Sequence, residues 1–154
     1  MTRLRLAFTI TLLLGGLFSP VAADAQQAAK SARIGYLGLN VAATPHLAGA
    51  FLQGLRDLGY VEGRSVVIEW RDAEGKIERL PALAAELVAL KVDVIVAGGQ
   101  VHALAAKQAT RTIPIVFASA PDPVESGLVT SLARPGGNVT GLSNLNRDLL
   151  GKRL

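Results

Sequence analysis

The sequence contains no cysteine among its 154 residues. This absence excludes disulfide bonds, thiolate zinc sites, cysteine nucleophiles and a lipid-modified cysteine anchor. Histidine is also scarce, with His46 and His102 as the two representatives. Two histidines do not suggest a multi-histidine metal centre, and we predict that the protein uses neither a metal nor another cofactor.

A strong charge of one sign is absent too. The net charge is +4, and removal of residues 1–25, which hold Arg3, Arg5 and Asp24, would leave 14 basic and 11 acidic residues, or +3. The remaining basic residues are scattered along the chain rather than clustered. This distribution is typical of an ordinary solvated surface, so no nucleic-acid partner is predicted.

The N-terminus has the pattern of a secretory signal peptide. Arg3 and Arg5 precede the mainly apolar stretch Leu6–Phe18, and Ala23-Asp-Ala25 then places small residues at a cleavage site. The apolar stretch of 13 residues is too short to span a bilayer core of about 30 Å. The sequence therefore predicts export to the periplasm with cleavage after Ala25, rather than a retained membrane anchor. Export also removes most nucleotide-dependent chemistry from consideration.

After a polar linker at residues 26–31, β-branched runs alternate with segments of helical periodicity. Such an alternation, with continuous apolar strands, predicts an α/β fold with a doubly wound, mostly parallel sheet in three α/β/α layers. Strands are expected at Ala32–Leu39, Ser65–Trp70, Val92–Ala97, Ile113–Ala118 and from Val139, and helices at Pro45–Leu58, Glu78–Leu90, Gln100–Thr110 and Val124–Leu132.

Two of these helices carry a leucine-rich stripe at helical spacing. The stripes predict one buried face on each helix, and Gly59 is expected to end the first helix. They consist of Leu47, Phe51, Leu55 and Leu58 in the first helix and of Leu80, Leu83, Leu87 and Leu90 in the second.

Three loops follow predicted strands at the edge where open α/β sheets bind ligands. The first contains Leu39 and Asn40. The second is Gly98-Gly-Gln100, where missing side chains let a ligand approach N–H groups at a helix N-terminus. The third holds Ser119 and Asp122 beside two prolines. A helix N-terminus favours a carboxylate and an acidic side chain favours an ammonium group, so the combination would suit an amino acid.

Each of these features also has a purely structural interpretation. Gly98-Gly99 can serve as a tight strand-to-helix turn, and Asp122 can cap the helix that follows it. His46 and His102 are expected at the surface or as capping residues rather than as bases. Residues 69–72 are equally consistent with a solvated edge.

Motifs of catalysis and nucleotide binding are missing. The sequence has no G-x-S-x-G elbow, Walker loop, H-E-x-x-H or G-x-G-x-x-G. Their absence favours binding over turnover, and we predict a non-enzymatic protein. Two alternatives stay open: an exported small hydrolase of Rossmann- or flavodoxin-like fold that uses Asp122 with His102, and a sensory ligand-binding domain.

Several stretches of the sequence occur in the same order in one known family. In these stretches, the chain resembles the bacterial ABC-transporter substrate-binding proteins related to tryptophan- and tyrosine-binding members. Together they span essentially all of residues 32–154. They are Arg33–Gly38, Phe51–Gly63, Val67–Gly75, Leu80–Val88, Thr112–Phe117, Asp122–Val124, Gly127–Val129 and Arg134–Gly141.

The resemblance implies a two-lobed clamp that closes on a small solute and presents it to an ABC transporter permease in the inner membrane. Residues 32–142 would form the first ligand-binding lobe. Residues 143–154 would form the hinge and the start of a second lobe, which is expected to be truncated. A single lobe would bury only part of a ligand. Carried over by position, the ligand-facing residues are Leu39, Asn40, Gly98, Gly99, Gln100, Ser119, Asp122 and Asn144.

The resemblance leaves the identity of the solute open. An amino acid or a related small organic molecule is one option. The residues of the first loop are small and aliphatic, so no aromatic platform for an indole ring is expected.

Overall fold

The five strands form one sheet in the order β2-β1-β3-β4-β5, and every pairing is parallel. A computed structural model of the protein describes residues 31–144; the predicted signal peptide and residues 145–154 of the predicted hinge lie outside this range. The observed strand order is that of a doubly wound fold and confirms the predicted fold class. The strands are β1 (Ala32–Gly38), β2 (Val66–Asp72), β3 (Val94–Ala97), β4 (Ile115–Ala120) and β5 (Val139–Ser143).

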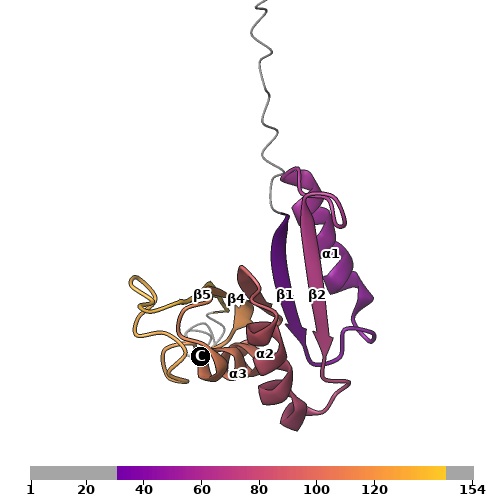
Figure 1. The fold of residues 1–154 in the computed structure, drawn as a ribbon. Helices are drawn as coiled ribbons and strands as arrows, with labels where there is room; N and C mark the ends of the chain where they lie inside the picture. Colours follow the sequence, from indigo (N-terminus) through magenta and orange to yellow (C-terminus); the bar gives the residue numbers. More distant parts are fainter. Residues whose placement is uncertain (1–30, 145–154) are drawn as a thin grey trace, which may run out of the picture.

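Helices cover both faces of the sheet (Figure 1). The first helix, α1 (Pro45–Asp57), lies against β1 and β2 on one face. On the opposite face lie α2 (Leu80–Ala89), preceded by a 3-10 turn (Ile77–Arg79), and α3 (Gln100–Ala109). Within residues 31–144, none of the helices is long and apolar enough to cross a membrane.

The main hydrophobic core lies between the sheet and the pair α2 and α3. Alternate strand residues point into it, because successive side chains on a strand face opposite sides of the sheet. The predicted stripe of α2 faces the same core, with Leu90 partly buried at its end. Burial of each large aliphatic side chain contributes roughly 1.5–3 kcal/mol. The largest fully buried side chains are Leu37, Leu80, Leu87, Ile95, Ile115, Leu128 and Val66, of which Val66 belongs to the smaller core under α1.

The apolar stripe of α1 is buried less than the sequence predicts. Phe51 and Leu55 pack partly buried against the sheet, whereas Leu47 is 54% and Leu58 is 75% exposed. The prediction of a continuous buried face is therefore wrong at both ends of α1. Gly59 does end the helix: its φ is +85°, and its N–H donates to the Arg56 carbonyl at 2.9 Å. A left-handed residue at this position is the usual way to close a helix, and glycine adopts it without steric cost.

The face of the sheet that carries α1 is covered unequally. Val94 and Val96 of β3 still pack with the α1 cluster. In the next strands the corresponding apolar residues, Val116 and Leu142, are exposed. Within the part of the chain that the structure describes, the layering is therefore complete over β1 to β3 and one-sided over β4 and β5.

The helix predicted at Val124–Leu132 is not formed, and the segment consists of turns. Gly127 adopts a φ of +70°, which interrupts right-handed helical geometry after a single turn. The loop is nevertheless fixed, because Leu128 and Val129 are buried in the main core. In addition, the Lys107 ammonium donates to the Gly127 carbonyl at 2.6 Å.

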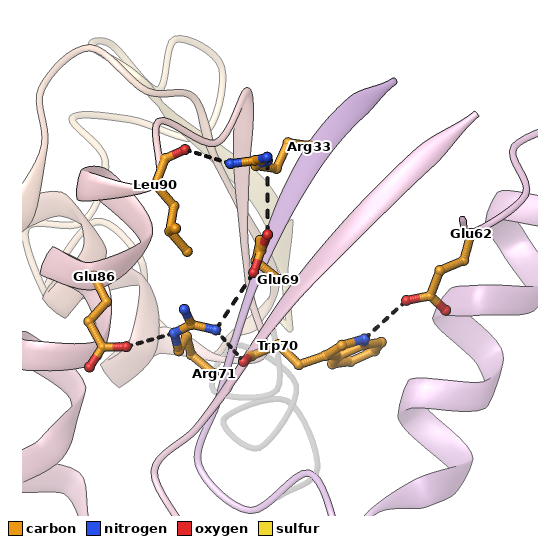
Figure 2. A network of polar contacts seen from close by, with 7 residues as sticks. All are labelled: Arg33, Glu62, Glu69, Trp70, Arg71, Glu86 and Leu90. Atoms are coloured by element: carbon orange, nitrogen blue, oxygen red, sulfur yellow. Dashed lines mark hydrogen bonds and ion pairs between the residues drawn. The ribbon is translucent and has the colours of Figure 1, made fainter. Parts of the chain in front are cut away.

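Polar contacts tie the edge strand β2 to its neighbours on both faces of the sheet (Figure 2). Arg71 pairs with Glu86 of α2 at 2.7 Å, and Glu69 lies 3.9 Å from both Arg33 and Arg71. On the other face, the Trp70 indole N–H donates to Glu62 at 3.4 Å. Partly exposed ion pairs of this kind contribute little singly. Together they connect residues 69–71 to β1, α2 and the loop before β2, so these residues do not form a free solvated edge.

Candidate functional site

The carboxyl ends of β1 and β3 meet where the strand order of the sheet reverses. From this point β1 leads to α1 on one face and β3 leads to α3 on the other, so the two loops diverge and leave a crevice. A cavity of about 230 Å³ opens there, and we call it the switch-point pocket. None of its described lining residues is an acid, a lysine or an arginine. They are Tyr36, Gly38, Leu39, Asn40, Val41, Thr44, Leu47, Gly98 and His102.

The first wall of the pocket, the loop from β1 to α1, is held by Asp72 at the end of β2. The Asp72 carboxylate accepts the N–H of Val41 at 2.9 Å and, more weakly, that of Ala42 at 3.4 Å. Its other oxygen accepts the N–H of Glu74 at 2.9 Å. Asp72 is therefore a positioning residue for this loop, a role that the sequence interpretation of residues 69–72 missed.

Asn40 lies in the same loop, and the oxygen of its side-chain amide already accepts a hydrogen bond. Its Oδ1 accepts the N–H of Ala43 at 3.2 Å, and its backbone carbonyl accepts the Thr44 hydroxyl at 3.1 Å. No hydrogen bond to a residue of the described range uses the Asn40 amide nitrogen. This exposed donor is therefore available to a bound solute.

An aromatic side chain, Tyr36, lines the pocket from the α1 face of the sheet. Its ring centroid lies 4.7 Å from that of Trp70 and 5.3 Å from that of Phe51. Its hydroxyl lies next to Gly98, 3.6 Å from where a Cβ on that glycine would be. Burial raises the pKa of Tyr36, so its hydroxyl stays protonated. Tyr36 thus places an aromatic side chain at the pocket, although its packing leaves it 8% exposed. The expectation of no aromatic platform considered the loop and not the strand beneath it.

His102 also lines the pocket, from the first turn of α3. It is only 9% exposed, which contradicts the prediction of a surface residue. Both ring nitrogens are buried, and the backbone of Gly99 is the polar group that lies beside Nδ1. Burial lowers the pKa of His102, an effect that the Gly99 backbone only partly opposes. The imidazole is therefore neutral at pH 7. The burial of His102 could have been predicted from its helical spacing relative to Ala103 and Ala106, which share the buried face of α3.

The buried imidazole predicts a pH-dependent stability. In the unfolded chain His102 takes up a proton near its ordinary pKa of 6.5, whereas in the folded chain it does so only at lower pH. The contribution of the neutral imidazole to the stability of the fold is therefore fully present above pH 6.5 and decreases as the pH falls below this value. We expect the urea midpoint to fall more between about pH 7.5 and about pH 5.5 in the wild type than in His102→Gln.

The control for this experiment is His46→Gln, which removes the exposed histidine of α1. It should keep the pH dependence of the wild type. Equal pH dependence in His102→Gln and the wild type would contradict the buried, neutral state of His102.

A second cavity, of about 430 Å³, lies between the N-terminus of α3 and the loop that follows β4. We call it the β4-loop pocket. Its described lining residues are Gln100, Pro121, Asp122, Glu125 and Ser126. The Asp122 N–H donates to Gln100 Oε1 at 3.4 Å, and the Asp122 carboxylate accepts the Glu125 N–H at 3.1 Å. Asp122 thus stabilises a turn, a role similar to the helix cap that was its structural alternative in the sequence analysis. It also faces the pocket.

Two further residues of the predicted set, Ser119 and Asn144, are brought into direct contact. The Asn144 amide donates to Ser119 Oγ at 2.6 Å, and the Asn144 N–H donates to the Ala120 carbonyl at 2.9 Å. Gly99 lies between Gly98 of the switch-point pocket and Gln100 of the β4-loop pocket in the chain. A Cβ on it would lie 3.3 Å from His102 Nδ1 and 3.8 Å from the Ser119 carbonyl.

All eight predicted residues therefore lie at the carboxyl edge of the sheet, in three groups. The switch-point pocket contains Leu39, Asn40 and Gly98, and the β4-loop pocket contains Gln100 and Asp122. The pair proposed for a hydrolase, Asp122 and His102, is divided between the two pockets. No group of three His, Asp or Glu side chains suited to a metal ion occurs in the range 31–144.

Comparison with known proteins gives consistent matches to binding proteins. A family model described as ABC transporter substrate binding protein matches residues 42–152. A tyrosine-binding protein of Clostridioides difficile is 40% identical over 94 residues, which cover 61% of this chain and 27% of the relative. The family and this relative are binding proteins rather than enzymes, in agreement with the sequence prediction.

Solved structures show the same fold. A conserved domain protein from Vibrio cholerae is 34% identical with a TM-score of 0.71, and the match covers 81% of this chain and 44% of that one. An ABC domain in complex with L-Trp from Streptococcus pneumoniae is 31% identical with a TM-score of 0.68, over 73% and 38% of the two chains. The chain thus spans less than half the length of each of these proteins.

Proposed function

The chain belongs to the ABC transporter substrate-binding protein family, and from this premise we propose that it is the solute-binding component of an uptake transporter. Residues 32–142 are its first ligand-binding lobe. The observation that carries the proposal is the switch-point pocket, which lies at the position where open α/β sheets bind ligands. Its wall combines an aromatic ring with uncharged hydrogen-bonding groups, as small-molecule sites commonly do.

The solute that suits this lobe best is an aromatic amino acid. One relative is named for tyrosine binding and another was solved with L-Trp. The ring would enter the uncharged switch-point pocket and rest against Tyr36. The carboxylate of the amino acid would lie at the N-terminus of α3, and its ammonium group would face Asp122 in the β4-loop pocket. In this arrangement Tyr36 joins the ligand-facing residues expected from the sequence, which are Leu39, Asn40, Gly98, Gly99, Gln100, Ser119, Asp122 and Asn144.

The mechanism we propose is closure of two lobes around the solute. Residues 1–25 would direct the chain to the periplasm, and residues 143–154 would lead through the hinge into a second lobe. Binding energy would stabilise the closed state rather than a transition state. The closed form would then be recognised by a permease in the inner membrane. A lobe that presents one wall of the site buries part of the solute and should bind it more weakly than the whole clamp.

Ligand-dependent stabilisation tests this proposal. We expect L-tyrosine or L-tryptophan, at concentrations up to solubility, to raise the melting temperature progressively, with a stabilisation that grows as the logarithm of the ligand concentration above Kd. A ligand at about 100 times its Kd adds roughly 2.7 kcal/mol to the stability of the folded state. Tyr36→Leu should abolish the increase, because it removes the ring that lines the pocket.

The matched control is the other tyrosine of the chain, Tyr60, which is exposed and lies outside the pockets. Tyr60→Leu should keep the full ligand effect. A melting temperature unchanged by every aromatic and aliphatic amino acid would contradict the proposed function. An equal ligand effect in both tyrosine variants would place the site elsewhere.

A further inference from the structure

The hydroxyl group of Tyr36 is an unused hydrogen-bonding group at the wall of the switch-point pocket. The residue is 8% exposed, and its ring is held by Phe51 and Trp70 at centroid distances of 5.3 and 4.7 Å. Within residues 31–144, no hydrogen bond uses the hydroxyl. In contrast to the ring nitrogens of His102, it is not shut off from solvent. Polar groups on buried side chains are almost always hydrogen-bonded, so this accessible hydroxyl indicates a partner that binds there.

Two glycines open the side chain of Tyr36 to the pocket. A Cβ on Gly38 would lie 3.4 Å from Cε1 of the ring, and a Cβ on Gly98 would lie 3.6 Å from the hydroxyl. Both glycines line the switch-point pocket. Because neither carries a side chain, one edge of the ring and the hydroxyl are left uncovered on this side. The hydroxyl therefore faces the space that a solute would enter.

The uncapped N-terminus of α3 begins two residues after Gly98. Its N-cap is Gly99, and no side chain of the described range caps the helix. The Ala103 N–H donates to the Gly99 carbonyl at 3.0 Å as the first helical hydrogen bond, so the N–H groups of residues 100–102 have no acceptor within the helix. Such an end favours a negatively charged group. The described wall of the pocket also holds no acidic side chain that would repel one.

We propose that Tyr36 determines specificity by donating a hydrogen bond from its hydroxyl to the carboxylate of the solute. Burial raises the pKa of Tyr36, so the phenol stays protonated and can act as the donor. The carboxylate would accept this bond together with N–H groups of α3. Hydrogen bonds to a charged acceptor are stronger than those to a neutral one, so the site would favour a free carboxylate over an amide or an ester. The inference rests on the proposed function, because it takes the solute to be an amino acid bound at the switch-point pocket.

The test compares L-tryptophan with L-tryptophanamide, which differ at the carboxyl group. Dissociation constants are measured by NMR titration of the full chain, a method that also detects weak binding. Tyr36→Phe keeps the ring and removes the hydroxyl, and we expect it to weaken tryptophan binding about tenfold or more, the worth of a charge-assisted hydrogen bond. It should weaken tryptophanamide binding only about threefold, because a bond to a neutral carbonyl is worth less. Tyr60→Phe, at the exposed tyrosine, is the control and should leave both constants unchanged.

A second readout does not depend on any variant of Tyr36. The chain has two tyrosines, so their Cζ resonances, which respond to hydrogen bonding of the hydroxyl, are readily assigned with Tyr60→Phe. Tryptophan should shift the Tyr36 Cζ signal more than tryptophanamide at equal saturation, and the Tyr60 signal should stay in place. Equal shifts at Tyr36, or an equal change of the two constants in a folded Tyr36→Phe, overturn the inference and leave the proposed function intact. Failure of all aromatic amino acids to bind overturns the proposed function itself.

Discussion

Gly141→Ala is expected to lower the free energy of unfolding by about 2–4 kcal/mol, a large fraction of the stability of a domain of this size. Gly141 pairs with Phe117 in the β4–β5 ladder. A Cβ on Gly141 would overlap with the carbonyl oxygen of Phe117 and with its ring. Since Phe117 is buried in the main core, neither group can move aside without loss of packing. The added methyl group must therefore push β5 away from β4.

Urea unfolding followed by circular dichroism measures this effect, and two other glycines provide a matched control. Gly49 and Gly54 lie within α1, and a Cβ on either would meet nothing within 4 Å. Gly49→Ala and Gly54→Ala should be neutral or stabilising by up to about 1 kcal/mol, because alanine is the better helix former. If Gly141→Ala behaved like these two, the close approach of β5 to Phe117 would be refuted.

Gly98→Val is expected to reduce solute affinity by about 100-fold or more, and to change stability by less than about 1 kcal/mol. A Cβ at this position would lie 3.6 Å from the Tyr36 hydroxyl and 3.7 Å from the Leu37 carbonyl, both ordinary contacts. The fold therefore has room for a side chain there. Because Gly98 lines the switch-point pocket, that room is the space in which the ring of the solute is proposed to lie.

NMR titration with L-tyrosine and urea unfolding of the same variant separate the two effects. Gly98→Ala should give an intermediate loss of affinity, and Gly54→Ala, two helical turns beyond the pocket residue Leu47 on α1, should bind normally. Unchanged affinity in a folded Gly98→Val would show that the solute does not enter the switch-point pocket. Loss of both affinity and stability would instead show that the pocket cannot accommodate the side chain.

The strand and helix pattern was predictable because it depends on local sequence. Each strand contains a β-branched or apolar run, and three of the four predicted helices are present within about two residues of their expected ends. The exception, Val124–Leu132, fails for a reason that is partly visible in the sequence. Gly127 adopts a left-handed conformation there. Burial of Leu128 and Val129 in the core outweighs the weak helical preference of the segment.

The stripe of α1 was overestimated for a different reason. Periodicity shows which residues share a face of a helix, but not how much of that face a neighbouring element covers. Leu47 and Leu58 lie on the same stripe as Phe51 and Leu55, yet only the middle pair packs against the sheet.

The fold class, and the edge of the sheet at which the candidate site lies, were predictable from the order of strands and helices in the sequence. A parallel α/β order brings the loops after β1, β3 and β4 to the same edge whatever their exact contacts are. This is why Leu39, Asn40, Gly98, Gln100 and Asp122 could be named as candidates from their positions alone, although their contact with a solute is still a proposal.

Which side chains line that site, or hold its loops in place, depends on long-range packing. Tyr36, Asp72 and His102 come from a strand interior, a strand end and a helix, so no loop-based argument could select them. Asp72 reaches Val41 across 31 positions of the chain, and His102 meets the switch-point pocket only because α3 folds back against the sheet. The burial and partners of a side chain depend on segments distant in sequence, and they set the pKa and the hydrogen-bonding capacity of the residues that line the pocket.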